Sequence, residues 1–419
     1  MKIGLLSFEY PPETGFGGIG TYTWYQARAL AKLGHDVHVL AGATSATPLI
    51  ATEHDGVTVH RFRSAGLLMK GFGALGKLGM WWTKNRLENA LSMYRGLGAL
   101  LKQHRFDVLE MPECGAEGAL INHLLGARTV VRFHSPARLI MPYYAVPRSD
   151  VRWCGRIEQL GIRGADSFTS CSRFLAREVA RELGVTKPIR VISNGIDLEL
   201  FDAEDQLDFR RRFDLPSDRL LIFFSGRMEQ RKGIELCREI AATILTRHDV
   251  AFVLAGQDLF NYVGGELLPF VQSKQLRGSI HYLGKLDLAS VRSGLRQSDI
   301  FLLPSLWENC PYSCLEAMAA GRAIVSSDQG GMPELIEDGV NGLLARSGDP
   351  ASYVNALEAL IADRGLRERL GAAARKTVET SHTDTLMARL SVDHYQESPE
   401  AGSRRHRSAP APDATPAAR

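Results

Sequence analysis

Two glutamates in one short stretch are the side chains that most clearly suggest chemistry. Glu308 follows an apolar run that ends at Pro304, and Glu316 lies near the start of a predicted helix that ends at Gly321. A carboxylate in a loop and a carboxylate in the first turns of a helix can bind two ends of one polyol ligand, while the helix amino end attracts an anion. Separated glutamates are common, so this pair alone does not identify a binding site.

Two cations in another short segment are suited to bind a diphosphate. Arg227 and Lys232 follow the apolar run 220–225, and glycines flank the segment at Gly226 and Gly233. At the carboxyl end of a strand, Arg can bind two phosphate oxygens with its planar fork, and Lys adds a point charge. The alternative is a solvated basic loop that binds no ligand.

A glycine-rich segment near the start of the chain is a candidate phosphate-binding loop. Gly17 and Gly18 lie between a predicted strand, 3–7, and a predicted helix, 21–33. Glycines let the backbone approach a phosphate, and the helix amino end adds a favourable dipole, but a tight turn would also need glycine. The second predicted strand ends at residues 40–42 without an acidic residue, which argues against a nicotinamide-binding site.

His134 directly follows the apolar run 129–133, so it is expected at the carboxyl end of a strand. A lone histidine is more often structural than catalytic, and the residues alone leave both interpretations open. The chain contains no Asp-x-Asp segment, so we expect no carboxylate-bridged metal on a diphosphate and no metal cofactor. Its six cysteines include no Cys-x-x-Cys pair, which argues against structural zinc.

Short apolar runs alternate with helical stretches along the chain, which predicts an α/β fold with parallel sheets covered by helices. Two such series, each starting with an apolar run that leads into glycine, predict two doubly wound halves joined near residues 190–200. Ligands of such folds bind at the carboxyl ends of the strands, here in a central cleft between the halves. The strands are expected at residues 3–7, 35–40, 107–109, 129–133 and 167–170, and then at 220–226, 251–255, 280–283, 300–304 and 323–326.

Composition excludes several classes of protein. The chain has 419 residues and a formal net charge of +3, which argues against a general nucleic-acid-binding surface. Its 45% hydrophobic and 23% charged residues are typical of a globular protein. No apolar stretch reaches the roughly 18 residues of a membrane span, and the apolar run at the start is too short for a signal peptide. We therefore expect a cytoplasmic protein, with the inner face of the membrane as a second possible place.

Taken together, these segments resemble the two-domain, retaining nucleotide-sugar glycosyltransferases of the glycogen-synthase-like group (glycosyl transferases group 1, GT-B fold). The resemblance runs from Lys2 to about Tyr395. Besides the glycine loop, the motifs that carry it are Gly-His-x-Val from Gly34, Asn194-Gly195-Ile196-Asp197, Gly-Arg-x-x-x-x-Lys-Gly from Gly226, Ser298-Asp299-Ile300-Phe301, the Glu308/Glu316 pair, Gly330-Gly331-Met332-Pro333-Glu334 and Gly339-Val340-Asn341-Gly342.

The resemblance implies a role for each candidate residue. The catalytic set that it implies is His134, Arg227, Lys232 and Glu308. The donor-binding set that it implies is Gly17, Gly18, Arg227, Lys232, Glu308, Cys314, Leu315 and Glu316. In these sets Arg227 and Lys232 would bind the diphosphate, Glu308 the hydroxyls of the donor sugar, and Glu316 those of the ribose. His134 would lie beside the donor sugar, and Cys314 and Leu315 would supply backbone donors.

The implied reaction moves a sugar, with retention and without a metal or other cofactor, from a UDP-, GDP- or ADP-sugar to a hydroxyl acceptor. Bacterial polysaccharide, glycolipid or other glycoconjugate biosynthesis is the expected setting. Two alternatives are a nucleotide-sugar epimerase and a catalytically silent nucleotide-sugar-binding protein. The acceptor is open: residues 66–86 are apolar, basic and free of acids, which suits peripheral contact with an anionic membrane and a lipid-linked acceptor. Five glycines in that segment argue against a stable helix, and a flexible acceptor loop is an equal alternative to membrane contact.

Four segments are expected along the chain. Residues 1–195 form an N-terminal, acceptor-side Rossmann-like domain, and 196–380 form a C-terminal, nucleotide-sugar-binding Rossmann-like domain. Residues 381–397 form a last helix that packs back on the N-terminal domain. Residues 398–419 contain no large apolar side chain and are expected to be a disordered tail.

Overall fold

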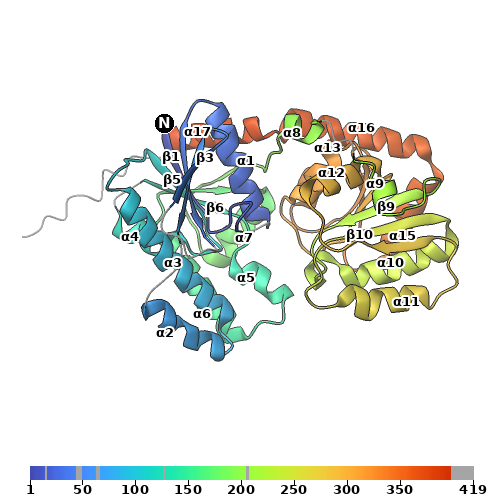
Figure 1. The fold of residues 1–419 in the computed structure, drawn as a ribbon, viewed down its shortest axis with the longest axis horizontal. Helices are drawn as coiled ribbons and strands as arrows, with labels where there is room; N and C mark the ends of the chain where they lie inside the picture. The colour runs from blue at the N-terminus through green and yellow to red at the C-terminus, as the bar shows by residue number, and fades with distance from the viewer. Residues whose placement is uncertain (15–16, 44–49, 63–66, 126–127, 204–206, 398–419) are drawn as a thin grey trace, which may run out of the picture.

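The computed structural model has two lobes, each a twisted sheet with helices on both faces (Figure 1). It describes residues 1–14, 17–43, 50–62, 67–125, 128–203 and 207–397. The prediction for 398–419 therefore lies outside the described residues. The α/β fold with two doubly wound halves is confirmed, and the limits of the predicted domains stay a prediction.

The first sheet has eight strands in the order β3-β4-β2-β1-β5-β6-β7-β8. Every neighbouring pair is parallel except β3 and β4, which form an antiparallel hairpin at one edge. Its strands are β1 (Lys2–Leu6), β2 (Asp36–Gly42), β3 (Ile50–His54), β4 (Val57–Phe62), β5 (Val108–Pro112), β6 (Thr129–Phe133), β7 (Ser167–Ser170) and β8 (Ile189–Val191).

The second sheet has six strands, all parallel, in the order β11-β10-β9-β12-β13-β14. Its strands are β9 (Leu220–Ser225), β10 (Val250–Ala255), β11 (Ser279–Tyr282), β12 (Ile300–Leu303), β13 (Ala323–Ser327) and β14 (Leu343–Ala345). Nearly every residue of β9, β10, β12 and β13 is buried, as expected for parallel strands covered on both faces.

Helices follow most strands and cover the sheets. Those of the first half are α1 (Gly18–Lys32), α2 (Leu67–Lys77), α3 (Trp81–Leu100), α4 (Gly118–Leu124), α5 (Ala137–Ile140), η1 (Met141–Tyr143), α6 (Arg148–Gly164) and α7 (Arg173–Leu183). The others are α8 (Leu198–Asp202), α9 (Phe209–Arg212), η2 (Gln230–Lys232), α10 (Ile234–Arg247), η3 (Val263–Leu267), α11 (Leu268–Gln272), α12 (Leu288–Gln297), α13 (Tyr312–Ala319), α14 (Met332–Leu335), α15 (Pro350–Ala362), α16 (Arg364–Ser381) and α17 (Asp384–Glu397).

The helix α2 corrects one prediction. Residues 67–77 form a helix although Gly71, Gly73 and Gly76 lie within it, whereas the glycines were expected to prevent a stable helix. The helix packs along α3, and tertiary packing of this kind outweighs the roughly 1 kcal/mol that each glycine costs a helix. The turn between the two helices uses Gly79, whose φ of +75° suits glycine.

The last helix, α17, runs back to the first half of the molecule and packs against α1 (Figure 1). Its Tyr395 is fully buried and donates a hydrogen bond to the Glu110 carboxylate at 2.7 Å. The chain thus crosses between the halves twice, once near Gly195 and once near Thr383. Among the helices of the described ranges, none is both long and apolar enough to cross a membrane.

Candidate functional site

A cleft of about 1540 Å³ lies between the two halves and is lined by both. The loops that form it follow the carboxyl ends of the strands, where ligands of doubly wound folds bind. The structure brings seven of the nine predicted site residues to its wall: Gly17, Gly18, His134, Arg227, Lys232, Glu308 and Glu316. The two others, Cys314 and Leu315, have side chains that are fully buried in α13.

Glu308 is the centre of a buried ion-pair network. Its carboxylate binds the ammonium of Lys232 and, at 3.2 Å, Nη1 of Arg231. Burial alone would raise the pKa of Glu308, but the Lys232 and Arg231 charges outweigh it and hold the pKa below its ordinary value. The carboxylate is therefore ionised, and its position is set by two cations.

Lys232 is more buried than expected from the sequence. Arg231, its neighbour, is a further residue of the network that was not predicted. Lys232 was treated as a loop cation, but only 14% of its side chain is exposed, because it pairs with Glu308. Arg231, which is 6% exposed, bonds to Glu229 at 2.9 Å and to the carbonyl of Trp307 at 3.1 Å. Its position directly before Lys232 in the Gly-Arg-x-x-x-x-Lys-Gly motif was the available signal.

Arg227 has the opposite character. Its side chain is 55% exposed and lies 3.4 Å from Glu229, at the start of the same loop. Glu9, from the loop after β1, faces it across the cleft. Burial raises the pKa of Glu9. A hydrogen bond from the backbone of Gly20 and the charge of Arg227 lower it, but burial outweighs them. Arg227 is thus a cation that a ligand in the cleft can reach.

Glu316 lies on α13 and faces the cleft with little of its surface exposed. Burial raises its pKa to about 7, and Arg292 opposes that effect. In the described part of the chain the carboxylate has no hydrogen-bond donor from another side chain. A buried carboxylate without donors is suited to accept hydrogen bonds from the hydroxyls of a ligand.

At the start of α13, the amides that the helix leaves without an acceptor lie two residues before the predicted Cys314 and Leu315. The amides of Cys314 and Leu315 donate to the Pro311 carbonyl at 3.1 and 3.3 Å. Ser313 lines the cleft at the second position of the helix, where the helix itself offers no acceptor for an amide. An anion at this helix end would therefore meet Tyr312 and Ser313 first.

His134 is held from two sides. Its ring centroid lies 4.9 Å from that of Tyr22. Burial, and to a smaller extent the positive charge of Arg132, holds the pKa of His134 well below the ordinary value, so the imidazole is neutral. Its amide donates to the Glu113 carboxylate at 3.0 Å, and its carbonyl accepts from Asn309 Nδ2 at 2.6 Å across the cleft. The second contact joins His134 to the residue next to Glu308.

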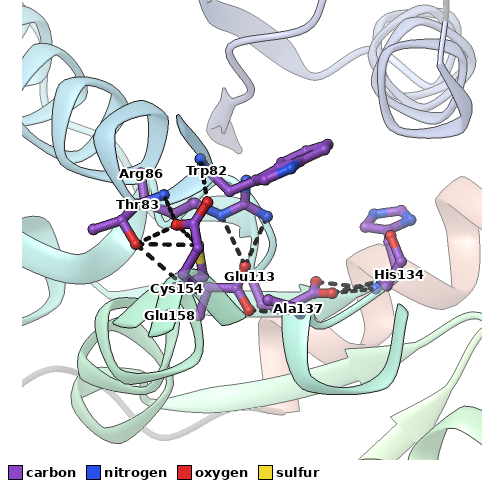
Figure 2. A network of polar contacts seen from close by, with 10 residues as sticks. Trp82, Thr83, Arg86, Glu113, His134, Ala137, Cys154 and Glu158 are labelled. Atoms are coloured by element: carbon purple, nitrogen blue, oxygen red, sulfur yellow. Dashed lines mark hydrogen bonds and ion pairs between the residues drawn. The ribbon is translucent and has the colours of Figure 1, made fainter. Parts of the chain in front are cut away.

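A buried polar network supports the turn that carries His134 (Figure 2). The Glu113 carboxylate also accepts from the amide of Ser135 at 2.7 Å, and burial raises its pKa to about 8. Behind it, Arg86 pairs with Glu158 at 3.1 Å, and the Glu158 carboxylate accepts from the amide of Ala137. Glu113 was not predicted; its place after β5 was the only signal in the sequence.

The glycine loop precedes α1. Gly17 is the N-cap residue of that helix, and a Cβ there would lie 2.7 Å from the Glu9 carboxylate. Gly18 is the first helical residue, with open space around it. The amino end of α1 therefore lies at the cleft wall, and the Glu9 carboxylate lies against it and accepts a hydrogen bond from the backbone of Gly20.

Within the described ranges, one group of imidazoles could hold a metal ion, and it lies away from the cleft wall. Nitrogens of His38, His60 and His104 lie within 4.8 Å of one another in the first half. The rings of His38 and His60 are nearly parallel, and Nδ1 of His38 lies 2.8 Å from Nε2 of His60, which is a hydrogen bond. A metal there would have to break that bond, so the arrangement favours a hydrogen-bonded pair.

Two family models match the chain. "Glycosyl transferases group 1" matches residues 205–377, and "Glycosyltransferase Family 4" matches residues 16–200. An uncharacterised glycosyltransferase of Methanocaldococcus jannaschii is 27% identical over 94% of this chain and 98% of its own length. A D-inositol 3-phosphate glycosyltransferase of Xylanimonas cellulosilytica is 28% identical over 87% of this chain and 88% of its own length.

Solved structures share the fold. Sucrose-phosphate synthase of Thermosynechococcus elongatus superposes with a TM-score of 0.77 at 20% identity, covering 94% of this chain and 98% of that one. HepE of Anabaena, solved in complex with UDP-glucose, gives a TM-score of 0.69 at 17% identity, covering 94% and 99%. With two matched halves and a GT-B fold, this chain belongs to the group 1 glycosyltransferases.

Proposed function

We propose that this glycosyltransferase moves a sugar from a nucleoside-diphosphate sugar to a hydroxyl acceptor, with retention and without a metal ion. The observation that carries the proposal is the ionised Glu308, held by Lys232 and Arg231 in the same cleft as the accessible Arg227. A carboxylate beside a cation pair can bind sugar hydroxyls and a diphosphate next to each other. HepE, which shares the fold, was solved with UDP-glucose, which supports a nucleotide-sugar donor.

Each group would have a separate task in the reaction. The transition state resembles an oxocarbenium ion, and negative charge grows on the leaving diphosphate. A cation about 4 Å from that charge contributes roughly 4 kcal/mol at an effective dielectric near 20. Arg227 and the start of α13 would bind the diphosphate, while Lys232 holds Glu308 and adds its own charge. The neutral His134 would act as a hydrogen-bonding group beside the sugar, not as an acid.

For the proposed retention, pairing of the Glu308 carboxylate with Lys232 and Arg231 favours attack by the acceptor itself over a covalent intermediate on Glu308. We assign Glu308 to the sugar hydroxyls, and its two cationic partners make it a poor nucleophile. Glu316 lies at the proposed ribose position. We infer that the acceptor attacks from the face that the diphosphate leaves, with a phosphate oxygen taking the acceptor proton.

The test is a donor panel of UDP-, GDP- and ADP-sugars in excess EDTA. Release of nucleoside diphosphate should depend on one donor class and survive EDTA, and nuclear magnetic resonance should show the anomeric configuration retained. Glu308→Gln serves as the inactive control. Strict dependence on added magnesium would contradict the diphosphate assignment. Conversion of the donor to an epimer would indicate an epimerase, and binding without turnover a silent protein.

We further propose that the acceptor is lipid-linked and reached at a membrane surface. Leu78 and Trp81, at the turn between α2 and α3, are 74% and 59% exposed, and Lys77 and Lys84 lie beside them. Exposed apolar side chains among cations suit an anionic lipid interface. Flotation with anionic vesicles should succeed for the wild type and fail for the Leu78→Ser, Trp81→Ser variant. A Leu259→Ser control, exposed elsewhere, should float normally; equal flotation of all three would contradict the proposal.

A further inference from the structure

Tyr144 connects the first half of the molecule to the charge network of the second half. It follows the helix η1, and its hydroxyl lines the cleft region near Arg231. The hydroxyl accepts from Nε of Arg231 at 3.1 Å and donates to the Glu229 carboxylate at 3.1 Å. Both bonds involve a charged partner, which makes them stronger than bonds between neutral groups.

Arg231 transmits this contact to Glu308. Its Nη1 donates to Glu308 at 3.2 Å and to the Trp307 carbonyl at 3.1 Å, and its Nη2 donates to Glu229 at 2.9 Å. The guanidinium is planar, so the partner of Nε helps to fix the plane in which the other two nitrogens donate. Tyr144 is the partner of Nε, and it is the member of this network that comes from the first half.

Neighbouring contacts hold Tyr144 in place. Its ring lies 6.4 Å from that of Trp82 on α3, and the ring of Tyr143 lies 6.2 Å from that of Trp307. Burial raises the pKa of Tyr144, so the hydroxyl keeps its proton and remains a donor at neutral pH. Because Tyr144 and Arg231 belong to different halves, their contact depends on how the two halves are placed.

We propose that Tyr144 is a positioning residue that orients the Glu308 carboxylate through Arg231. The orientation of that sugar-binding carboxylate then depends on whether the first half of the molecule lies close enough for Tyr144 to contact Arg231. The proposal rests on the proposed function, since it assigns Glu308 to the donor sugar. Removing the hydroxyl leaves Nε of Arg231 without its partner in a buried place. Glu308 would then keep its charge and its contact with Lys232, but its second partner, Arg231, would no longer be held in one orientation.

The experiment compares Tyr144→Phe with the matched control Tyr143→Phe. In the described structure the Tyr143 hydroxyl makes no hydrogen bond, so its loss should leave turnover unchanged. Tyr144→Phe should lower kcat about 10–100-fold, as expected for the loss of a charge-assisted hydrogen bond. Calorimetric affinity for the free nucleoside diphosphate should stay within about twofold of the wild type, because Tyr144 does not contact the proposed nucleotide position.

A second background tests whether Tyr144 acts through Arg231. Lys has no Nε–H, so in an Arg231→Lys background the change Tyr144→Phe should lower kcat by less than about threefold. An undiminished effect there would show that Tyr144 acts by another route, through Glu229 or by contact with the substrate, and would overturn the proposal, as would normal turnover of Tyr144→Phe. Equal losses of turnover and of nucleoside-diphosphate affinity would show a merely structural role. A wild type that binds no nucleotide sugar would instead contradict the proposed function itself.

Discussion

Arg227 and Lys232 were predicted as a similar pair of cations, but their surroundings differ. Arg227 is more than half exposed, whereas Lys232 is buried against Glu308. Arg227→Ala should therefore lower turnover by about 10²–10³ and leave the melting temperature unchanged, as the loss of one oriented charge donor does. Arg227→Lys should recover only part of the rate, because the planar fork is lost. Near-normal turnover of Arg227→Ala would revive the solvated-loop interpretation.

Lys232→Ala should affect both function and folding. It leaves Glu308 with Arg231 as its remaining cationic partner in a buried site, which should cost about 1–3 kcal/mol of stability. Both turnover and melting temperature should fall, in contrast to Arg227→Ala. If the two cations bind one diphosphate, the double variant should lose less turnover than the sum of the single effects. A Lys232→Ala protein with an unchanged melting temperature would contradict the buried pairing.

The raised pKa of Glu316 makes a prediction about pH. Because its pKa of about 7 lies above its ordinary value near 4.5, the folded protein binds this proton more tightly than the unfolded chain does. The resulting stabilisation is present below about pH 4.5 and is lost as the pH rises to 7. The melting temperature of Glu316→Gln minus that of the wild type should therefore be larger at pH 8 than at pH 5. An identical difference at both pH values would show that Glu316 titrates normally.

Nucleotide affinity should follow the same titration. Ribose hydroxyls would bind the ionised carboxylate, so wild-type affinity for the nucleoside diphosphate should fall by up to about tenfold per pH unit below pH 7. Glu316→Gln should bind more weakly and show a flatter pH dependence, measured by calorimetry between pH 5.5 and pH 8. A dependence as steep as that of the wild type would assign the titration to another group.

At the scale of elements, α14 joins the two halves around Glu308. Its Glu334 carboxylate accepts from the amides of Arg173 and Phe174 at 2.8 and 2.6 Å, and so caps α7 from the opposite half. Gly330 and Gly331 come so close to the loop of Glu308 that a Cβ on either would lie 2.0 Å from a backbone oxygen. The Gly-Gly-Met-Pro-Glu motif thus positions the Glu308 loop and α7 together.

Glu334→Gln should weaken this cap by about 1 kcal/mol, because a carboxylate at a helix amino end is also favoured by the helix dipole. Hydrogen exchange of the Arg173 and Phe174 amides should become about fivefold faster. The matched control is Glu337→Gln, on an exposed side chain that bonds to no residue in the described structure. Unchanged exchange of the two amides in Glu334→Gln would show that the contact does not stabilise α7.

At the scale of the whole molecule, the two chain crossings touch each other. The amide of Ile196 donates to the His382 carbonyl at 2.9 Å, and that of Asp384 donates to the Ile196 carbonyl at 3.1 Å. A Cβ on Gly195 would lie 2.2 Å from the carbonyl oxygen of Thr383. Gly195 belongs to the Asn194-Gly195-Ile196-Asp197 motif, and a glycine is needed there for this close approach of backbones.

Gly195→Ala should therefore push the two crossings apart and lower the melting temperature, because the neighbouring group is backbone and cannot rotate away. Gly98→Ala is the matched control: it lies in α3 with open space around it, so it should be neutral or slightly stabilising. A Gly195→Ala protein that melts like the control would show that the two crossings can separate without loss of stability.

The order of elements was largely predictable from the sequence. Buried parallel strands such as β9 and β10 appear as continuous apolar runs, and glycines and polar residues mark their carboxyl ends. Arg227 and Glu308 could be placed at the cleft for that reason. The strands that were missed lie at the sheet edges or near them: β3, β4, β8 and β14 are partly exposed or short, so their apolar pattern is weak.

The sequence by itself determined the two-lobed α/β fold, its glycosyltransferase motifs and the side chains that gather in the cleft. Only the tertiary structure decided which charges pair with one another. Lys232 is buried, Arg231 holds Glu308, and Tyr144 reaches Arg231 from the other half, although more than 80 residues separate Tyr144 from Arg231. A local pattern reports burial and backbone preference, whereas the partner of a charged group depends on how separate elements pack together.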